Sequence, residues 1–493
     1  MKMRILLFIL CIGLLPVSAR ADVKPHALCS EGMVLQQKAK VNIWGTADKG
    51  EKVTVTFRDE KAAATADGDG RWLVTLNSGP AGGPFEMTIA GNNTISYKNV
   101  LVGEVWICSG QSNMEQSVNG SDKDDKEIAT SAPHNPMLRM FTVKKNPQMK
   151  PQTDTGGAWT DAKPETVGKF SAVGYFFGRN LQEKRNVPVG LIHTSWGGTR
   201  IEAWMSETTL APYEKPTANP KNPHNVAAAL YNGMIHPLLN YQVKGAIWYQ
   251  GESNAGQAYK YRSLHPAMIE NWRADFKNPE LAFYFAQLAP YGSVKKAPDE
   301  SRWAELREAQ TMTLKLKNTG MAVITDCGCE YDIHPTPKRP IGQRLALAAR
   351  AQTYGEKIVY SGPRYKSVKF ENGKAVLTFD HLGGGLVTKE LVPTLQRKNK
   401  DGSISSAWRV KDNSKDAPLV GFTICGRDKV FQTAFAEIVG DTVVVGCSKV
   451  DEPVAVRYGW ANHPICNLYN REGLPASPFR TDTFPGVTQP KNQ

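Results

Sequence analysis

Between about residues 101 and 355, the chain alternates short apolar runs with longer segments that have the period of a helix. The apolar runs, each long enough for one strand, are 101–108, 189–195, 243–249, 281–288 and 320–326. The segments with helical period are 171–184, 261–276, 303–317 and 342–353. Apolar strands separated by helices pair in parallel, because each crossover returns the chain to the same edge of the sheet. The alternation predicts an α/β domain whose parallel sheet carries helices on both faces.

Strand-like segments of a different kind flank this region. From residue 22 to about residue 100, short runs alternate apolar and polar residues, as in 40–44, 53–57 and 71–76. Similar runs return after residue 356, as in 367–370, 375–379, 442–445 and 455–458. Because 493 residues are too many for one core, we expect three domains. They are β-sandwich-like regions at 22–100 and 356–493, and the α/β domain at 101–355.

The first 21 residues have the composition of a secretory signal peptide. Lys2 and Arg4 precede an apolar run over 5–17, and 19–21 places small residues at both positions of a cleavage site. The run is too short to span a bilayer, and Pro16 interrupts it. We therefore expect residues 1–21 to be removed and the protein to be exported, to a periplasm or out of the cell. No later segment reaches a spanning length, so we expect no membrane span.

The charge of the chain does not indicate a nucleic-acid partner. The formal net charge is +13, and the predicted signal peptide accounts for three positive residues and no acidic ones, which leaves 13 − 3 = +10. Basic and acidic residues are interspersed without a dense basic block. Such a surplus is typical of a soluble surface, or of one that attracts anionic glycans.

The sequence gives no reason to expect a cofactor or a metal. It lacks the H-E-x-x-H motif and the paired C-x-x-C units of zinc sites. Neither a G-x-G-x-x-G motif nor a P-loop follows a predicted strand. The seven cysteines beyond the predicted signal peptide are too sparsely spaced for a disulfide framework.

A serine lies just after the first apolar run of the α/β region, in Gly110-Gln111-Ser112-Asn113-Met114. In open α/β sheets, the carboxyl ends of the strands build the binding site. A serine nucleophile needs a base, which is usually histidine. His334 follows the last predicted strand and therefore opens at the same edge of the sheet. Either residue alone would more often be an ordinary loop residue, but together they predict a nucleophile and its base.

Three further blocks follow Gly110–Met114 in order, each after a predicted strand or closing one, at 195–204, 248–254 and 332–335. These four blocks resemble those of the SGNH (GDSL-like) hydrolase superfamily, and more specifically of the sialate O-acetylesterase family. The runs 457–460 and 467–470 are similar to the end of that family, so the resemblance covers nearly the whole mature chain. It implies an SGNH-type, flavodoxin-like sheet and a serine esterase that removes O-acetyl groups from sugars, most of all from sialic acids.

The resemblance also implies an oxyanion hole for acyl transfer. The backbone N–H groups of Ser112 and Gly198 would donate to the oxyanion. The superfamily's third block offers an amide side chain to the oxyanion, and here Gln250, Ser253 and Asn254 are candidates by type.

Four residues are predicted to lie near the mouth of the pocket and to bind substrate: Arg200, Glu202, Trp204 and Trp248. An arginine there could pair with a carboxylate such as that of sialic acid. The tryptophans could stack on a sugar ring. Structural packing at the edge of the sheet is an equally good interpretation of all four.

The third member of the triad is open. The superfamily has an aspartate three residues before the histidine, a position that Tyr331 occupies here. Asp332 is our choice, because it shares a short loop with His334. The alternatives are Asp326, Glu252, Glu330, or a backbone carbonyl that completes a Ser–His dyad.

Two other functions remain possible from the sequence. An acetyl xylan esterase or another polysaccharide deacetylase would use the same chemistry on a different sugar. A glycan-binding protein without activity would suit the flanking β regions. In each case the expected partner is a carbohydrate, and for the enzymes it is an O-acetylated one.

Overall fold

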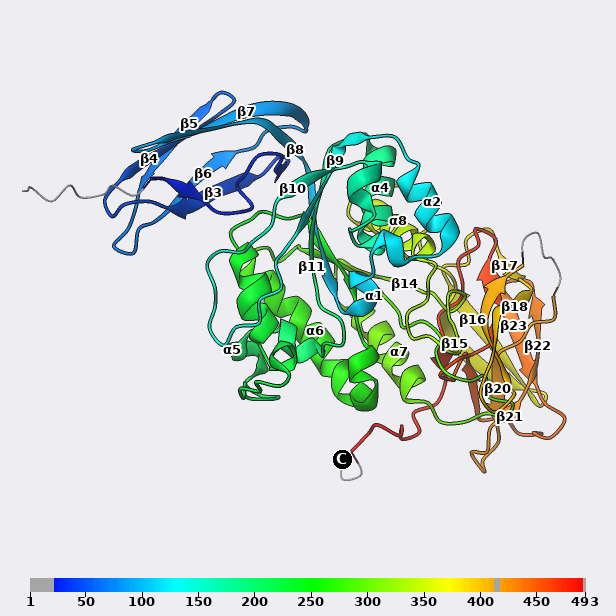
Figure 1. The fold of residues 1–493 in the computed structure, drawn as a ribbon. Coiled ribbons are helices and arrows are strands. Elements are labelled where there is room, and N and C mark those ends of the chain that lie inside the picture. Colours follow the sequence, from blue (N-terminus) through cyan, green and yellow to red (C-terminus); the bar gives the residue numbers. More distant parts are fainter. Residues whose placement is uncertain (1–21, 412–416, 491–493) are drawn as a thin grey trace, which may run out of the picture.

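The computed structural model describes residues 22–411 and 417–490 (Figure 1). The predicted signal peptide lies outside the described residues. A β-rich region stands at each end of the molecule, and a layered α/β region lies between them. In the described part of the chain, no helix combines the length and the apolar character needed to cross a membrane.

A sheet with the strand order β10-β9-β11-β8-β12-β13-β14 forms the centre of the molecule. From β9 to β14 all neighbours pair in parallel, and only the edge strand β10 is antiparallel. The strands are β8 (Thr94–Gly110), β9 (Asn135–Thr142), β10 (Trp159–Ala162), β11 (Val189–Ser195), β12 (Gly245–Tyr249), β13 (Ala282–Ala286) and β14 (Thr319–Ala322). The predicted α/β architecture is confirmed, although the sequence analysis missed β9 and β10.

Helices cover both faces of this sheet. Along β8, Val105 and Ile107 belong to one buried cluster, whereas Trp106 and Cys108 belong to another. Successive strand residues point to opposite faces, so each cluster marks one face. The first face is covered by α6 (Ala258–Asp275) and α7 (Arg302–Met312), and the second by α4 (Ala172–Arg185) and α8 (Arg339–Gln352). All four helices correspond to predicted segments, but α7 ends earlier than expected.

The N-terminal β region shares a strand with the central sheet. The first part of β8 pairs with β2 (Val34–Gln36) and β7 (Gly82–Ala90), and the part from Glu104 onward pairs with β11 and β12. Gly103 lies between the two parts, where a Cβ atom would stand 2.0 Å from the carbonyl oxygen of Pro188. The other strands of this region are β1 (Lys24–Pro25), β3 (Lys40–Thr46), β4 (Lys52–Phe57), β5 (Glu60–Thr65) and β6 (Arg71–Asn77). The shared strand joins this region to the α/β sheet through continuous backbone pairing.

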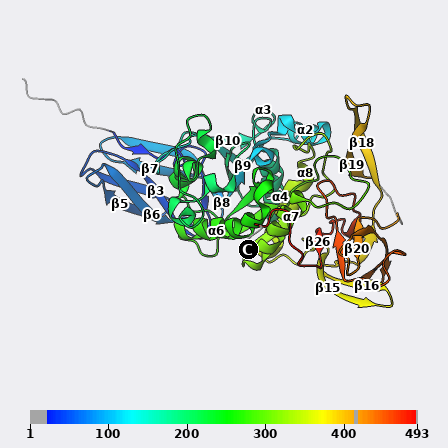
Figure 2. The ribbon, with the colours of Figure 1, turned by 90° about the horizontal axis from the view of Figure 1, so that it is seen from below.

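The C-terminal β region consists of small antiparallel sheets. Its strands are β15 (Arg364–Glu371), β16 (Lys374–Asp380), β17 (Leu386–Thr388), β18 (Leu391–Lys398), β19 (Ile404–Val410), β20 (Phe422–Cys425), β21 (Gln432–Thr433), β22 (Phe435–Val439), β23 (Thr442–Gly446), β24 (Ala455–Tyr458), β25 (Leu468–Asn470) and β26 (Phe479–Arg480). Figure 2 shows that β18 and β19 form a hairpin that projects from the rest of this region.

Short helices occupy many of the loops. They are α1 (Ser112–Glu115), α2 (Lys123–Thr130), α3 (Pro164–Val167), α5 (Glu207–Leu210), the 3-10 turns at Val118–Gly120, Ile201–Trp204, Pro223–Asn225, His236–Leu238, Glu252–Gln257 and Thr313–Lys315, and a π turn at Tyr231–Ile235. The predicted strand 320–326 ends at Ala322, because Asp326 turns away to pair with Arg344 on α8. The loop that carries the predicted base follows.

Candidate active site

Ser112 stands where β8 ends and α1 begins. Gly110 has φ +136°, and a Cβ atom there would lie 2.1 Å from the carbonyl oxygen of Tyr249, so the close approach to β12 requires glycine. The next N–H, that of Gln111, donates to the same carbonyl oxygen at 2.9 Å. The neighbouring strand thus fixes the turn that presents Ser112.

The second sequence block lies against the serine. Glu115 accepts the N–H of Gly197 at 2.6 Å and also pairs with Lys145. A Cβ atom on Gly197 would lie 3.2 Å from Cβ of Ser112. Gly198 has φ +73° and borders open space. The predicted oxyanion donors, the N–H groups of Ser112 and Gly198, therefore belong to adjoining segments.

His334 and Asp332 face each other within one short loop. Oδ1 of Asp332 lies 3.3 Å from Nδ1 of His334 and accepts the backbone N–H of His334 at 2.8 Å. Both residues line an open cavity of about 690 Å³, together with Ser112. Two segments far apart in the sequence therefore meet at one cavity, and the contact through Nδ1 leaves Nε2 of His334 available to another partner.

The competing carboxylates have other partners. Asp326 makes two hydrogen bonds with the guanidinium of Arg344, at 2.7 and 2.6 Å, and this cation lowers its pKa despite burial. Glu330 accepts from the backbone N–H of Ser406 and from the indole of Trp408. Oε1 of Glu252 accepts from Asn113 at 2.6 Å. Asp332, by contrast, contacts the imidazole of His334 directly.

The two amides of the third block lie inside a buried network rather than at the cavity. Nε2 of Gln250 donates to the carbonyl oxygen of Thr199 at 3.1 Å and to Oδ1 of Asn254 at 2.7 Å, which uses both of its N–H bonds. Oδ1 of Asn254 also accepts the N–H of Ile201 at 2.9 Å. In this geometry Gln250 has no N–H left for an oxyanion. Both amides instead brace the segment that follows Gly198.

The charged pair predicted to bind substrate is engaged within the protein. Both terminal nitrogens of Arg200 donate to the carboxylate of Glu214, at 3.0 and 2.9 Å. Glu202 is fully buried and accepts from Asn254 and Lys260. Neither Arg200 nor Glu202 is among the residues that line the 690 Å³ cavity.

The two tryptophans lie in the core. Trp204 and Trp248 are both 0% exposed, and their rings meet edge to face at 6.1 Å. A ring that is fully buried cannot stack on a sugar unless the core reorganises. The packing interpretation, left open by the sequence, therefore describes them better than substrate binding.

The cavity has lining residues that the sequence analysis did not select: Glu115, Lys145, Lys169 and His193. Nε2 of His193 lies 2.6 Å from Oγ of Ser195, and burial lowers the pKa of His193 to about 4, so this ring is neutral at pH 7. Two of these residues could have been selected from the sequence. Glu115 directly follows the first block, and His193 lies near the carboxyl end of a predicted strand.

The C-terminal hairpin holds the loop that carries the base. Arg409 on β19 donates to the carbonyl oxygen of Gly328 at 2.6 Å, and the hydroxyl of Tyr331 donates to that of Leu395 on β18 at 2.8 Å. The carboxylate of Glu330, described above, joins the same loop to β19. The C-terminal region thus supports the loop of His334 from outside the α/β domain.

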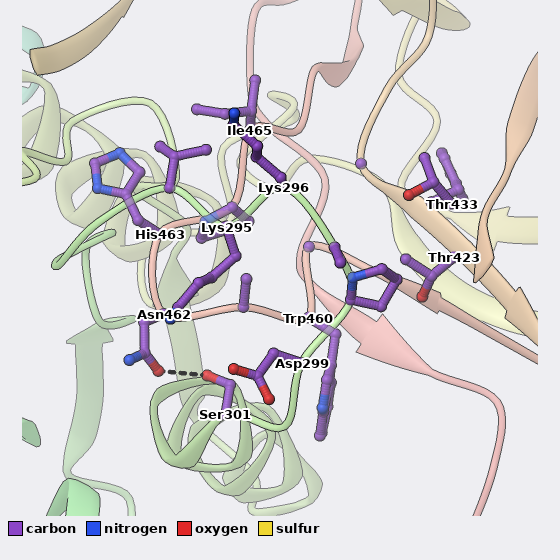
Figure 3. A pocket seen from close by; sticks show the side chains of 18 of the residues that line it. Lys295, Lys296, Asp299, Ser301, Thr423, Thr433, Trp460, Asn462, His463 and Ile465 are labelled. Carbon is purple, nitrogen blue, oxygen red and sulfur yellow. Dashed lines mark hydrogen bonds between the residues drawn. The ribbon is translucent and has the colours of Figure 1, made fainter. Parts of the chain in front are cut away.

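A second cavity, of about 370 Å³, lies between the catalytic and C-terminal regions (Figure 3). Lys295, Asp299 and Trp460 line it, and at its edge Ser301 donates to Asn462 at 2.7 Å. It contains none of the predicted catalytic residues. In the described part of the chain, no three His, Cys, Asp or Glu side chains gather closely enough to hold a metal ion.

Comparisons with known proteins identify the family of this chain. Residues 102–351 match the family described as carbohydrate esterase, sialic acid-specific acetylesterase. The chain is 32% identical to the sialate O-acetylesterase of Homo sapiens and 31% identical to that of Pongo abelii, each over 92% of both chains. It is also similar to the crystal structure of a carbohydrate acetylesterase from Xanthomonas citri, with a TM-score of 0.84 and 41% identity over 94% of this chain and 100% of that one.

These similarities extend over the β regions as well as the central sheet. The matched family segment contains the four blocks, including Ser112 and His334. Together the comparisons identify a carboxylic ester hydrolase that acts on O-acetylated sugars. The chain belongs to the sialate O-acetylesterase family of carbohydrate esterases.

Proposed function

We propose that the protein hydrolyses O-acetyl esters of sugars by serine acyl transfer, with Ser112 as nucleophile, His334 as base and Asp332 as the carboxylate that orients it. One observation carries this proposal. Ser112, Asp332 and His334 line one cavity, and Asp332 contacts Nδ1 of His334 at 3.3 Å. A carboxylate at Nδ1 favours the tautomer whose free Nε2 can accept the proton of the serine.

The chemistry follows from these positions. Nε2 of His334 takes the proton of Ser112 as Oγ attacks the acetyl carbonyl carbon, and the carbonyl oxygen becomes an oxyanion. The N–H groups of Ser112 and Gly198 donate to this oxygen. The sugar oxygen leaves with the proton from His334, and an acetyl-serine remains. Water, deprotonated by His334, then releases acetate and restores the serine.

Sialic acids are the substrates we propose first, because the curated relatives are sialate O-acetylesterases. Lys145 and Lys169 line the cavity and supply positive charge for a sugar carboxylate. Lys145 already pairs with Glu115. Among the described residues no ion pair involves the exposed Lys169, so Lys169 is the better candidate. Acetylated xylan or another polysaccharide is the second candidate, since the similar Xanthomonas protein is a carbohydrate acetylesterase.

We also propose a finer domain architecture and a cellular location for the protein. The parallel strands and the order of the four blocks support an SGNH-type, flavodoxin-like catalytic domain, with β-sandwich-like domains at 22–100 and 356–493. The composition of residues 1–21 supports export through a signal peptide. An exported enzyme would meet its glycan substrates outside the cytoplasm.

Acetate release from O-acetylated sialic acid, measured beside acetylated xylan and p-nitrophenyl acetate, tests the proposal. We expect Ser112→Ala to abolish all three activities. The matched control is Ser121→Ala, whose hydroxyl donates to the carbonyl oxygen of Val118. Lys169→Gln should raise KM for the sialic acid and leave p-nitrophenyl acetate turnover unchanged. Activity that survives in Ser112→Ala would overturn the mechanism. A preference for acetylated xylan would overturn the proposal that sialic acids are the substrates.

A further inference from the structure

Asn113, the residue after the proposed nucleophile, is 1% exposed and makes three hydrogen bonds. Its Nδ2 donates to Oε1 of Glu252 at 2.6 Å and to the carbonyl oxygen of Ile333 at 3.1 Å. Its Oδ1 accepts from Nζ of Lys338 at 2.6 Å. The side chain therefore joins α1 to the segment before α6 and to the loop before α8.

The two charged partners fix the orientation of this amide. A carboxylate can only accept hydrogen bonds, and an ammonium can only donate them. If the amide flipped, Oδ1 would face the carboxylate of Glu252 and Nδ2 would face the ammonium of Lys338. Both contacts would become repulsive, so only the observed orientation satisfies all three partners.

Removing the charged groups of Lys338 and Glu252 from water costs free energy. Lys338 is 0% exposed, and burial lowers its pKa to about 7. Burial likewise raises the pKa of Glu252, whose Oε2 has no hydrogen-bond partner among the described residues. Because apolar side chains of similar size often stabilise a core as well as or better than a buried ion pair, packing alone does not account for these two residues.

The hydrogen bond from Asn113 to Ile333 acts on the peptide group next to His334. The carbonyl of Ile333 and the N–H of His334 belong to the same peptide group. Asn113 holds its oxygen at 3.1 Å, and Asp332 holds its N–H at 2.8 Å. The peptide that carries His334 is thus held on both sides, on one of them by the residue next to Ser112.

We propose that Asn113 is a positioning residue, which ties the segment of the nucleophile to the peptide that carries the base, and that Glu252 and Lys338 hold its amide in the working orientation. The inference rests on the proposed roles of Ser112 and His334. It assigns Asn113 no contact with the substrate.

Asn113→Asp is the first test, because it changes the donor Nδ2 into an acceptor at nearly constant shape. The new oxygen faces two acceptors, Glu252 and the carbonyl of Ile333, so the peptide of His334 loses its anchor. We expect kcat to fall about 100-fold, the scale of a roughly 1 Å displacement of a catalytic group. KM should stay within about twofold, since no substrate contact is removed.

A compensating change distinguishes positioning from simple damage. In Asn113→Asp with Glu252→Gln, the glutamine amide donates to the new carboxylate, and the cluster keeps one negative and one positive charge. This double variant should recover about tenfold of the lost kcat. Recovery is incomplete, because the carbonyl of Ile333 still lacks a donor.

A second pair covers the case in which Asn113→Asp does not fold. Glu252→Gln with Lys338→Met removes both charges that contact Asn113, so thermal unfolding should show no loss of stability. The orientation of the amide is then no longer imposed, and kcat should fall about tenfold with KM unchanged. The matched control for Asn113→Asp is Asn271→Asp, at a buried asparagine on α6. Asn271 is 6% exposed and donates to Asp275.

Kinetics with p-nitrophenyl acetate, beside melting curves, decides between the outcomes. The proposal is overturned if Asn113→Asp keeps kcat within about threefold, if its loss lies in KM, or if the compensating variant recovers nothing. It is also overturned if the charge-free pair keeps full kcat. Failure of the proposed function has a separate signature, which is activity that persists in Ser112→Ala.

Discussion

Replacing Asp332 by asparagine would remove one charge from the site and preserve its hydrogen bonds. Oδ1 of Asp332 is the atom that contacts both Nδ1 and the backbone N–H of His334, at 3.3 and 2.8 Å. An asparagine can keep an oxygen in that place as the acceptor of both. The substitution therefore isolates how much the negative charge stabilises the imidazolium that forms in the transition state.

The size of the effect follows from distance and exposure. Opposite unit charges 3.3 Å apart attract by about 1.3 kcal/mol in water-like surroundings, and by about 5 kcal/mol at an effective dielectric constant near 20. The side chains of His334 and Asp332 are 41% and 46% exposed, which places the pair nearer the first limit. We expect a loss of about 1.4 to 2.7 kcal/mol, or about 10- to 100-fold in kcat. A fully buried triad loses about 10⁴-fold.

The assay is kcat for p-nitrophenyl acetate at saturating substrate, with Asp332→Ala as a second arm. Alanine removes the acceptor as well as the charge, so its loss should exceed that of asparagine. A loss below about threefold in both variants would refute the role of Asp332. A far larger loss in Glu252→Gln than in either would assign the role to Glu252 instead.

Three further predictions concern stability and metal dependence. Asp326→Asn should destabilise the fold by about 3 to 5 kcal/mol in urea unfolding, because it leaves the largely buried guanidinium of Arg344 without its carboxylate partner. Burial lowers the pKa of His193 to about 4 and that of His265 to about 3, so between these values and about 6.5 the unfolded chain binds more protons than the folded one. The unfolding free energy should therefore fall as the pH drops from 6.5 towards 4, and the pH dependence of thermal unfolding should be shallower in His265→Gln. EDTA should leave acetate release unchanged, and a loss of activity that zinc restores would contradict the serine mechanism.

Local patterns in the sequence encode the main elements of the catalytic domain. The apolar runs predict β8, β11 and β12, because a strand buried on both faces needs apolar residues at every position. The order of the strands along the chain then brings their carboxyl ends to one edge. For this reason the blocks with Ser112 and Gly198 can be assigned to one site from the sequence alone. The strands β9 and β10, which end one side of the sheet, were missed, since Asn135–Thr142 and Trp159–Ala162 mix polar with apolar residues.

What each polar or aromatic side chain contacts is set by tertiary packing. Trp204 and Trp248 carry the same chemistry whether they face a sugar or the core, and burial alone separates the two cases. Likewise, Arg200 pairs with Glu214 rather than with a ligand. Asn113 gave no signal of its own, because its partners lie far along the chain. Local sequence patterns show which positions along a strand or helix are buried. Hydrogen-bond partners depend instead on how distant segments pack, and packing is a property of the whole fold.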